Sequence, residues 1–494
     1  MGDRVKALVR YLERDAFPWT LALSVYVISH GLSFLFLGAV FWDDWTLVDV
    51  RPEVILDVYR QNGSVFAHAG YLHIAMLTTG PAGYHILTFV LLFASGVLVW
   101  AIVRAIPEVH AIDRSLIAIL IVTAPLYSAR VALIVFPYTL RLFLFFWAWY
   151  LLVTKRRTGS RVLSFALFAL SVNTPSLLVF YLLPCLHLLC QTFRQRSEEH
   201  AARAMLWIVP FGGLPLLFWF VKRQFFRPYG LLEGYNEINL GNLQHDLPWL
   251  VAGLAYTLVF VAVWRYVKSE RLKALSAIPI GLWILWLAVV PYRAIGFGVP
   301  IRVWWDLSFY DWWSRHQLLL PLGFAVVVTS VDKALRFKRV PVIVCLVVVA
   351  SVAYNVRVES EYYVDWTKQR EIIRLLGSSE DVRKSKTILF EDDAAFLNAR
   401  TRTFRHYEYN GWLKRAYGDE TRFAMDRPLW RGSLSDQIDP SWRNAFSEKY
   451  NAGQYVAGVP DALIRIHAAN GRWRTFVTGS AKVSLEVSLL HAGR

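Results

Sequence analysis

The sequence predicts an α-helical multi-pass membrane protein that ends in a small α/β domain outside the membrane. Three observations support this fold class. Hydrophobic residues make up 56% of the chain, above the roughly 45–50% that is usual for soluble domains. The apolar residues gather in long runs before residue 357, and the rest of the chain is charged and mixed. The 21 tryptophans suit a protein whose aromatic side chains lie at both membrane surfaces.

We predict about 11 transmembrane helices, taking roughly 20 apolar residues as one crossing. Two of the runs are shorter than a full crossing and could be half helices buried in protein, namely 115–129 and 162–173. The predicted spans are 18–40, 84–103, 115–129, 131–153, 162–173, 176–191, 204–221, 248–265, 275–292, 317–331 and 340–356.

The distribution of Lys and Arg predicts the orientation in the membrane. With a cytoplasmic N-terminus, the inner segments hold 21 basic residues and the outer loops up to residue 316 hold nine. This bias follows the positive-inside rule and predicts an extracytoplasmic C-terminal domain. The absence of cysteine pairs and of a signal sequence fits a plasma (inner) membrane, and an endoplasmic-reticulum location with a luminal site would share the same topology. The net charge of +16 then reflects loops that face anionic lipids. No nucleic-acid-binding motif accompanies the charge, so we do not expect a nucleic-acid partner.

The chain divides into a transmembrane module, residues 1–356, and a soluble extracytoplasmic α/β domain, residues 357–494. Residues 365–376 have the pattern of an amphipathic helix. Short β-branched and apolar runs predict strands in the C-terminal domain. These runs are 387–390, 462–466 and 483–487.

An acidic pair, Asp43-Asp44, directly follows the first apolar run. Carboxylates at a membrane boundary are costly to place and often functional. One of them could take a proton from an acceptor hydroxyl, and the pair could also hold a divalent metal ion. The plainer interpretation is a solvated loop start in which Trp42 and Trp45 anchor the chain at the interface.

Several cations are placed where a membrane protein would bind a phosphate. Arg130 lies between two short apolar runs and Arg141 lies inside the next predicted span. An arginine at such a depth needs a partner or a water-filled cavity. Lys222 and Arg223 follow the seventh span on the outer side, where they could bind a lipid phosphate or extend to the headgroups.

The outer loop before the tenth span combines aromatic and polar residues. It contains four tryptophans, which could form platforms for sugar faces or prenyl chains, and Arg315, whose planar guanidinium suits a phosphate oxygen. An aromatic belt with an interfacial arginine is an equally strong interpretation. His68 and His73 near the second span are five residues apart, a poor spacing for one metal site. The candidate substrate-binding residues are Asp306, Asp311, Trp312, His316 and His68.

With these features the chain resembles the GT-C superfamily of integral membrane glycosyltransferases. The likeness rests on the acidic pair after the first span, on the late segment 314–321 with its Arg and Leu/Pro, and on the outer C-terminal domain. It implies inverting transfer of a hexose or pentose from a polyprenyl-phosphate-linked donor to an extracytoplasmic glycan, lipid or protein. It also implies Asp44, or else Asp43, as the general base. Metal use differs between members and stays open.

The resemblance also suggests which cations bind the leaving phosphate. Arg315 and Arg130 are the first candidates, followed by Lys222 and Arg223. No Walker A loop or GxGxxG motif is present, so we expect a lipid-linked donor rather than a cytoplasmic nucleotide.

Two other classes of membrane protein fit the same layout. A lipid-linked oligosaccharide polymerase or ligase would have large outer loops and a pyrophosphate lipid, but does not need the acidic pair. A lipid or sugar transporter or flippase often shows internal repeats and broken helices at mid-membrane, and no repeat is apparent in this sequence.

Overall fold

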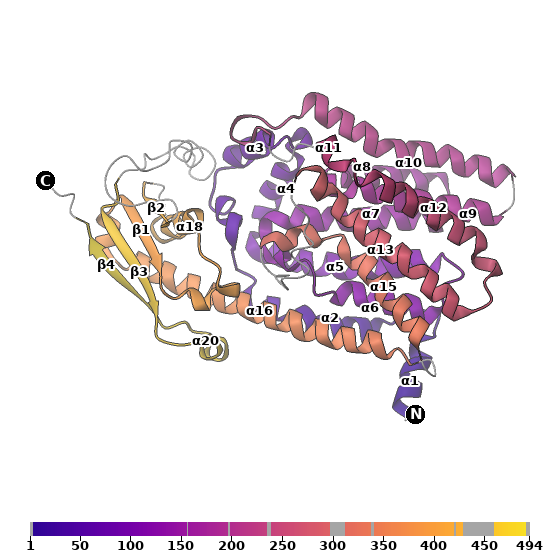
Figure 1. The fold of residues 1–494 in the computed structure, drawn as a ribbon. Helices are drawn as coiled ribbons and strands as arrows, with labels where there is room; N and C mark the ends of the chain where they lie inside the picture. The colour runs from indigo at the N-terminus through magenta and orange to yellow at the C-terminus, as the bar shows by residue number, and fades with distance from the viewer. Residues whose placement is uncertain are drawn as a thin grey trace.

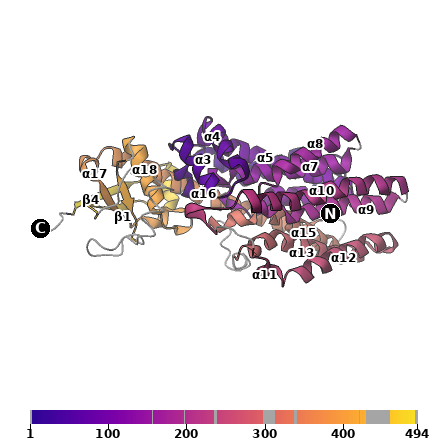
Figure 2. The ribbon, with the colours of Figure 1, turned by 90° about the horizontal axis from the view of Figure 1, so that it is seen from above.

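The computed structural model describes residues 3–155, 157–195, 198–234, 239–296, 312–336, 340–418, 421–427 and 459–490. A bundle of helices and a smaller α/β domain lie end to end, joined by the long helix α16 (Figures 1 and 2). The N-terminus lies at the end of the bundle away from the α/β domain.

The bundle is formed by helices of very different length. Five of them have a proline in the first turn, where its missing N–H costs nothing. The helices are α1 (Asp3–Leu12), α2 (Trp19–His30), α3 (Pro52–Gln61), α4 (His68–Leu77), α5 (Gly80–Arg104), α6 (Ala111–Thr123), α7 (Phe136–Thr154), α8 (Thr158–Ser171), α9 (Leu182–Gln195), α10 (Glu198–Phe225), α11 (Leu240–Leu243), α12 (Leu247–Val263), α13 (Glu270–Ala294), α15 (Leu320–Leu335) and α16 (Val342–Gly377).

The helical membrane architecture agrees with the sequence prediction, and each of the predicted apolar runs contains a helix. Within the described residues, six segments are long and apolar enough to cross a membrane. The remaining predicted spans correspond to shorter helices, including α6 and α8, which were already short in the sequence. The six long segments are Trp19–Phe36, Gly80–Arg104, Leu133–Thr154, Leu206–Phe225, Glu270–Ala294 and Val342–Gly377.

Helix α16 belongs to both parts of the molecule. Its 36 residues correspond to about 54 Å at 1.5 Å per residue, well beyond the ~30 Å hydrocarbon core of a bilayer. The first part is apolar, and charged residues begin at Arg357. The helix therefore runs unbroken across the expected domain boundary at residue 357, and the predicted amphipathic segment 365–376 is its last portion.

The C-terminal domain contains a four-stranded sheet in the order β2-β1-β3-β4. Strand β1 is parallel to β2 and β3, whereas β4 is antiparallel to β3. The three predicted strand segments lie in β1, β3 and β4. The domain consists of α17 (Glu380–Lys384), β1 (Thr387–Asp392), α18 (His406–Tyr417), β2 (Phe423–Met425), β3 (Ala462–Ala468), α20 (Arg472–Thr478) and β4 (Val483–Leu489).

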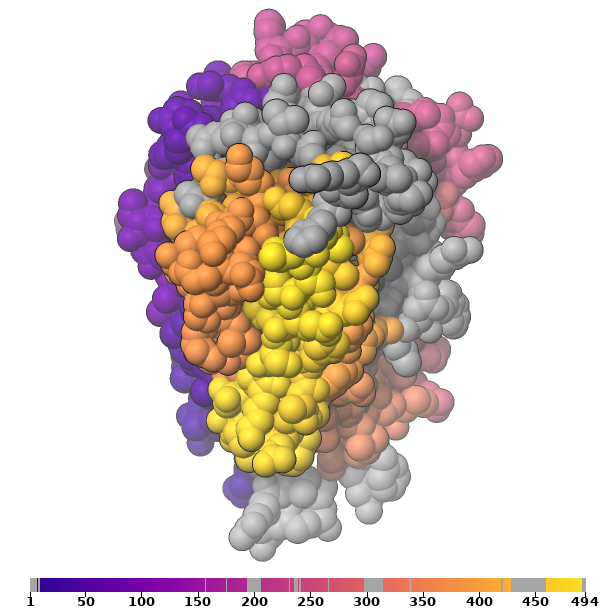
Figure 3. All heavy atoms as spheres, turned by 90° about the vertical axis from the view of Figure 1, so that its left-hand side faces the viewer, coloured from indigo at the N-terminus to yellow at the C-terminus, as the bar shows by residue number. Residues whose placement is uncertain are grey.

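One hydrophobic cluster links the sheet to the end of the bundle that carries the acidic pair. Buried residues of β1 and α18, such as Phe390 and Trp412, belong to the same cluster as Trp45 of the first outer loop and Phe136 of α7. Seen from the domain side, the α/β domain lies over this end of the bundle, with N-terminal residues beside it (Figure 3). The domain is therefore packed on the loop that carries the acidic pair.

Candidate functional site

The acidic pair lies in a short 3-10 helix, η2 (Trp42–Thr46), and its two carboxylates have different surroundings. Asp44 is fully buried. Its oxygens accept hydrogen bonds from the backbone N–H groups of Phe41 at 3.2 Å, Leu133 at 2.8 Å and Ile134 at 2.8 Å. Burial raises the pKa of Asp44 to about 8, although these three amides oppose the shift. Asp44 thus joins the first outer loop to η5 (Leu133–Val135).

Asp43 is the half-exposed member of the pair. Burial raises the pKa of Glu408 in α18 to about 7, and the charge of Asp43 adds to this shift, so Asp43 lies near the C-terminal domain. The sequence interpretation preferred Asp44 as the base, but the burial of the two residues favours Asp43. A general base must reach the proton that it removes, and both oxygens of Asp44 already accept backbone hydrogens.

The late arginine segment contacts the loop that carries Arg130. The hydroxyl of Ser314 in η10 (Trp312–Gln317) accepts hydrogen bonds from the backbone N–H of Ala129 at 2.7 Å and from the Ser128 hydroxyl at 3.0 Å. The backbone N–H of Tyr127 donates to Gln317 at 3.2 Å. Two segments that are far apart in sequence, each with a predicted phosphate-binding arginine, therefore lie side by side.

Arg130 itself has a counter-ion within the protein. Its guanidinium lies 3.2 Å from Glu359 of α16 and donates to Nδ1 of His30 at 2.6 Å. The Nε2 of His30 lies 2.9 Å from the carbonyl of Val122, which fits a neutral ring protonated at Nε2. This packed group satisfies the requirement for a partner at membrane depth. Arg130 is accordingly less available to a ligand phosphate than its sequence position suggested.

Arg141 has the opposite environment. Its side chain is 3% exposed. It donates to the carbonyl of Asn173 at 3.1 Å, to the hydroxyl of Thr174 at 3.3 Å and to Nδ1 of His68 at 3.0 Å. Within the described part of the chain no carboxylate forms an ion pair with it, and its Nε has no hydrogen-bond partner. A buried positive charge with neutral neighbours is expensive unless an anion joins it.

Lys222 lies near enough to Arg141 for their charges to repel each other. Arg223, the next residue, is exposed, and its guanidinium carbon lies 5.2 Å from the ring centre of Trp219. This exposed stacking on an aromatic ring is typical of a residue that anchors a helix at the membrane surface. Burial raises the pKa of Tyr59, whose hydroxyl also interacts with the charges of Arg141 and Asp44. Arg141 and Asp44 therefore both lie within electrostatic range of Tyr59, at the same end of the bundle.

The other predicted substrate-binding residues have separate environments. His68 bonds to Arg141, and burial together with that charge lowers the pKa of His68. His73 is stacked between Tyr59 and Tyr84, so the two histidines do not share a metal site. The ring of His316 lies 4.3 Å from that of Tyr292. Burial, with Arg315 alongside, lowers the pKa of His316 to about 3, which makes the ring neutral.

Part of the aromatic loop lies outside the described residues, including Asp306 and Asp311, and only the backbone of Trp312 is described. No group of three His, Cys, Asp or Glu side chains that could hold a metal ion occurs in the described ranges. At the acidic pair, Asp44 already accepts three backbone hydrogens, so a metal ion there would need ligands from beyond this pair.

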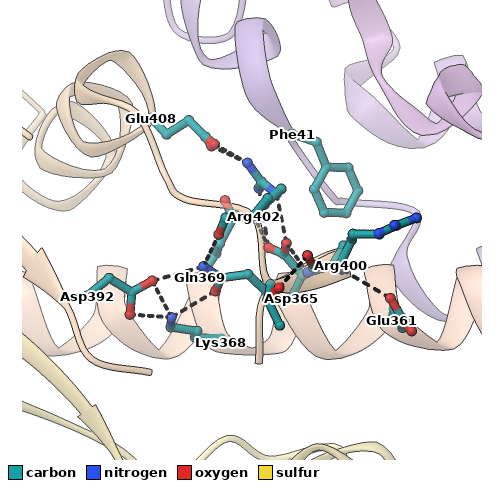
Figure 4. Close-up of polar contacts among 12 residues, drawn as sticks. Phe41, Glu361, Asp365, Lys368, Gln369, Asp392, Arg400, Arg402 and Glu408 are labelled. Atoms are coloured by element: carbon teal, nitrogen blue, oxygen red, sulfur yellow. Dashed lines mark hydrogen bonds and ion pairs between the residues drawn. The ribbon is translucent and has the colours of Figure 1, made fainter. Parts of the chain in front are cut away.

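A buried polar network joins the last part of α16 to the C-terminal domain (Figure 4). Lys368 of α16 is fully buried and donates to both oxygens of Asp392, at 2.6 and 2.7 Å. Arg402 pairs with Asp365 at 3.0 Å and with Glu408. Burial opposes the charge of Arg402, but these two carboxylates raise its pKa above the ordinary value.

This network reaches the tryptophans on both sides of the acidic pair. The guanidinium of Arg402 lies 5.2 Å from the ring centre of Trp42. The side-chain oxygen of Gln369 accepts hydrogen bonds from Nε1 of Trp45 and of Trp412, both at 3.1 Å. Gly411 of α18 packs on Trp45 so closely that a Cβ would lie 2.6 Å from the ring. The C-terminal domain thus holds η2 at both ends.

Sequence reasoning missed this network. Its one visible signal was the spacing of Asp365, Lys368 and Gln369, which places three polar residues on one helix face. A polar helix face is ordinarily expected to face solvent. This one is buried because its partners come from the C-terminal domain, which follows later in the sequence.

Comparison with protein-family models, with curated proteins and with solved structures gives no match, so the function is argued from the site itself.

Proposed function

We propose that the protein is a membrane glycosyltransferase of the GT-C type. It transfers a hexosyl or pentosyl group from a polyprenyl-phosphate-linked donor to a glycan, lipid or protein acceptor outside the membrane. The site lies at the outer end of the bundle, between the acidic pair in η2 and the cations of α7 and α10 (Phe136–Thr154 and Glu198–Phe225).

The observation that carries the proposal is the buried positive charge of Arg141. Its described neighbours are neutral or cationic, namely His68, Thr174, the carbonyl of Asn173 and, further off, Lys222. A phosphate on a membrane lipid is an anion that can enter such a site from the bilayer. Charge-assisted hydrogen bonds to phosphate are the strong ones, and Arg315 lies in a segment that could complete the site.

The proposed reaction is a single displacement. The Asp43 carboxylate takes the proton of the acceptor hydroxyl, and the resulting oxygen attacks the anomeric carbon of the sugar. The bond between that carbon and the phosphate oxygen breaks with inversion, and polyprenyl phosphate leaves with the electron pair. Arg141, Lys222 and Arg315 stabilise the charge on the leaving phosphate, while Asp44 acts as a positioning residue for the loop.

We also propose the finer topology. The short helices complete about eleven crossings of a plasma (inner) membrane, with the N-terminus in the cytoplasm and the C-terminal domain outside. The excess of Lys and Arg on the inner side supports this orientation.

The test combines two substitutions with two measurements. Release of polyprenyl phosphate from radiolabelled polyprenyl-phosphate sugars is measured in membranes with host acceptors. Asp43→Asn is expected to lower the rate by about 10²–10⁴-fold, the usual effect of losing a general base. Arg141→Met is expected to weaken the thermal stabilisation by polyprenyl phosphate, with affinity falling about 10–100-fold.

The matched controls are Glu53→Gln, an exposed acid of the same outer loop, and Arg223→Met, an exposed cation beside Lys222. Both should behave as wild type. Full activity of Asp43→Asn would remove the proposed base. The cations would suit a pyrophosphate lipid equally well, so turnover of pyrophosphate-linked oligosaccharides that is independent of Asp43 would favour the polymerase or ligase.

A further inference from the structure

An apolar cavity lies at the opposite end of the bundle from the acidic pair. It has a volume of about 280 Å³ and is lined by residues of α5, α6, α7, α9, α12, α13 and α15. Asp332, near the end of α15, accepts a hydrogen bond of 2.9 Å from the backbone N–H of Ile343 at the start of α16. This bond fixes the end of α15 beside the cavity. The walls are almost entirely apolar and include Ile102, Leu186, Phe260, Ile280 and Leu322.

Two polar side-chain atoms in the lining of this cavity lack a partner among the described residues. Thr329 is 4% exposed, and neither its hydroxyl nor Nε1 of Trp264 is hydrogen-bonded. Buried donors of this kind are normally satisfied. An apolar cavity with unsatisfied polar atoms therefore fits a ligand that is mainly hydrocarbon and carries polar groups at one end.

The mouth of the cavity carries charges of both signs. Lys333 lines the cavity, and its Nζ lies 3.2 Å from Asp113 and 2.9 Å from Glu270. Asp113 also lines the cavity and pairs with Arg336 at 2.9 Å. The side chain of Glu270 is 48% exposed, whereas that of Glu359, the partner of Arg130, is 2% exposed. The Lys333–Glu270 pair can therefore exchange its partners with a headgroup that holds both a phosphate and an ammonium group.

We propose that this cavity binds one acyl chain of a zwitterionic phospholipid from the leaflet opposite the C-terminal domain. The chain fills the apolar space, and the polar linkage at its upper end bonds to Thr329 and Trp264. The phosphate lies toward Lys333, and the ammonium lies toward Asp113 and Glu270. The site is independent of the proposed sugar transfer, because none of its residues belongs to the outer site.

The test is photo-crosslinking of the full-length protein in vesicles. The probe is a phosphatidylcholine that carries a diazirine in one acyl chain, and crosslinked peptides are mapped by mass spectrometry. In wild type, crosslinks are expected on cavity-lining peptides of α12, α13 and α15. Ala277→Trp places a large side chain in the cavity from α13. It should lower the yield of cavity crosslinks by about tenfold, which corresponds to a tenfold weaker affinity for the phospholipid.

Leu282→Trp is the control on the same helix, because Leu282 is exposed on the outside of the bundle. It should leave the cavity crosslinks unchanged. If Ala277→Trp does not fold, Val261→Trp of α12 fills the cavity from another wall, with the exposed Val259 substituted as Val259→Trp for comparison. Equal labelling of the cavity-filling and control variants would overturn the site. Phosphatidylglycerol with the same chain should label more weakly, and equal or stronger labelling would overturn the zwitterionic headgroup.

Discussion

Asp44 divides its carboxylate among three backbone N–H groups from two loops, at Phe41, Leu133 and Ile134. Its neighbour Asp43 remains half-exposed. Two identical residues, adjacent in sequence, therefore have different surroundings: Asp44 is buried and holds the loop, whereas Asp43 is partly exposed. The same contrast separates Arg130, which is paired with Glu359, from Arg141, which has no described carboxylate partner.

The titration of Asp44 gives a prediction about stability and pH. Its pKa rises from about 3.9 in an unfolded chain to about 8 in the folded protein, so the folded state binds the proton more tightly. The stability that this group contributes is complete below about pH 4 and is lost as the pH rises toward 8. We expect the melting temperature of wild type to fall across this window, and to fall less steeply in Asp44→Asn.

The slope attributable to one such group is at most about 1.4 kcal/mol per pH unit. Scanning fluorimetry of the detergent-purified proteins between pH 4 and 8 measures the difference. Glu53→Gln, in the same loop but exposed, should keep the wild-type slope. Parallel curves for wild type and Asp44→Asn would show that Asp44 does not titrate in this range.

At the residue scale the sequence indicated the site but not the role of each member. It singled out the acidic pair, Arg130, Arg141 and Arg315, and the structure brings the loops of Arg130 and Arg315 together through Ser314. It could not tell which aspartate turns inward. A five-residue 3-10 helix has no periodic pattern to read, and the backbone donors to Asp44 come from a loop that lies far away in sequence.

At the scale of elements, α16 connects the site to the rest of the protein. Glu359, just past the apolar part of the helix, pairs with Arg130, and Asp365, Lys368 and Gln369 in its last part bind the C-terminal domain. The apolar runs and three strands were predictable, because hydrophobic length and β-branched content are local signals. The continuity of α16 across residue 357 was not, because a change from apolar to charged residues looks the same whether a helix ends or leaves the membrane.

Gln369 gives the prediction for this element. Gln369→Leu removes the acceptor shared by Nε1 of Trp45 and Trp412, and each orphaned buried N–H costs about 1–3 kcal/mol. We expect a lower free energy of unfolding and faster protease cleavage within the loop that contains η2. Arg370→Leu changes the next, exposed residue and should have little effect on either readout. A Gln369→Leu protein as stable and protease-resistant as wild type would mean that this junction contributes little.

At the scale of the whole molecule, the C-terminal domain lies at one end of the bundle (Figure 1) and packs on Trp45, next to the acidic pair. The proposed orientation is testable by cysteine labelling after replacing Cys185, Cys190 and Cys345. Lys482→Cys in the domain should react with a membrane-impermeant maleimide in intact cells, whereas Lys268→Cys should react only after permeabilisation. Both native lysines are exposed. The reverse pattern would place the domain and the site on the cytoplasmic side.

The contacts of the C-terminal domain with both tryptophans of η2 have a consequence for biosynthesis. Trp42 and Trp45 emerge from the ribosome early, whereas Arg402, Gly411 and Trp412 follow only near the end of translation. The loop with the acidic pair must therefore wait for almost the whole chain before its surroundings are complete. A prematurely terminated chain would therefore lack the residues that hold both ends of η2 and would leave this loop unsupported.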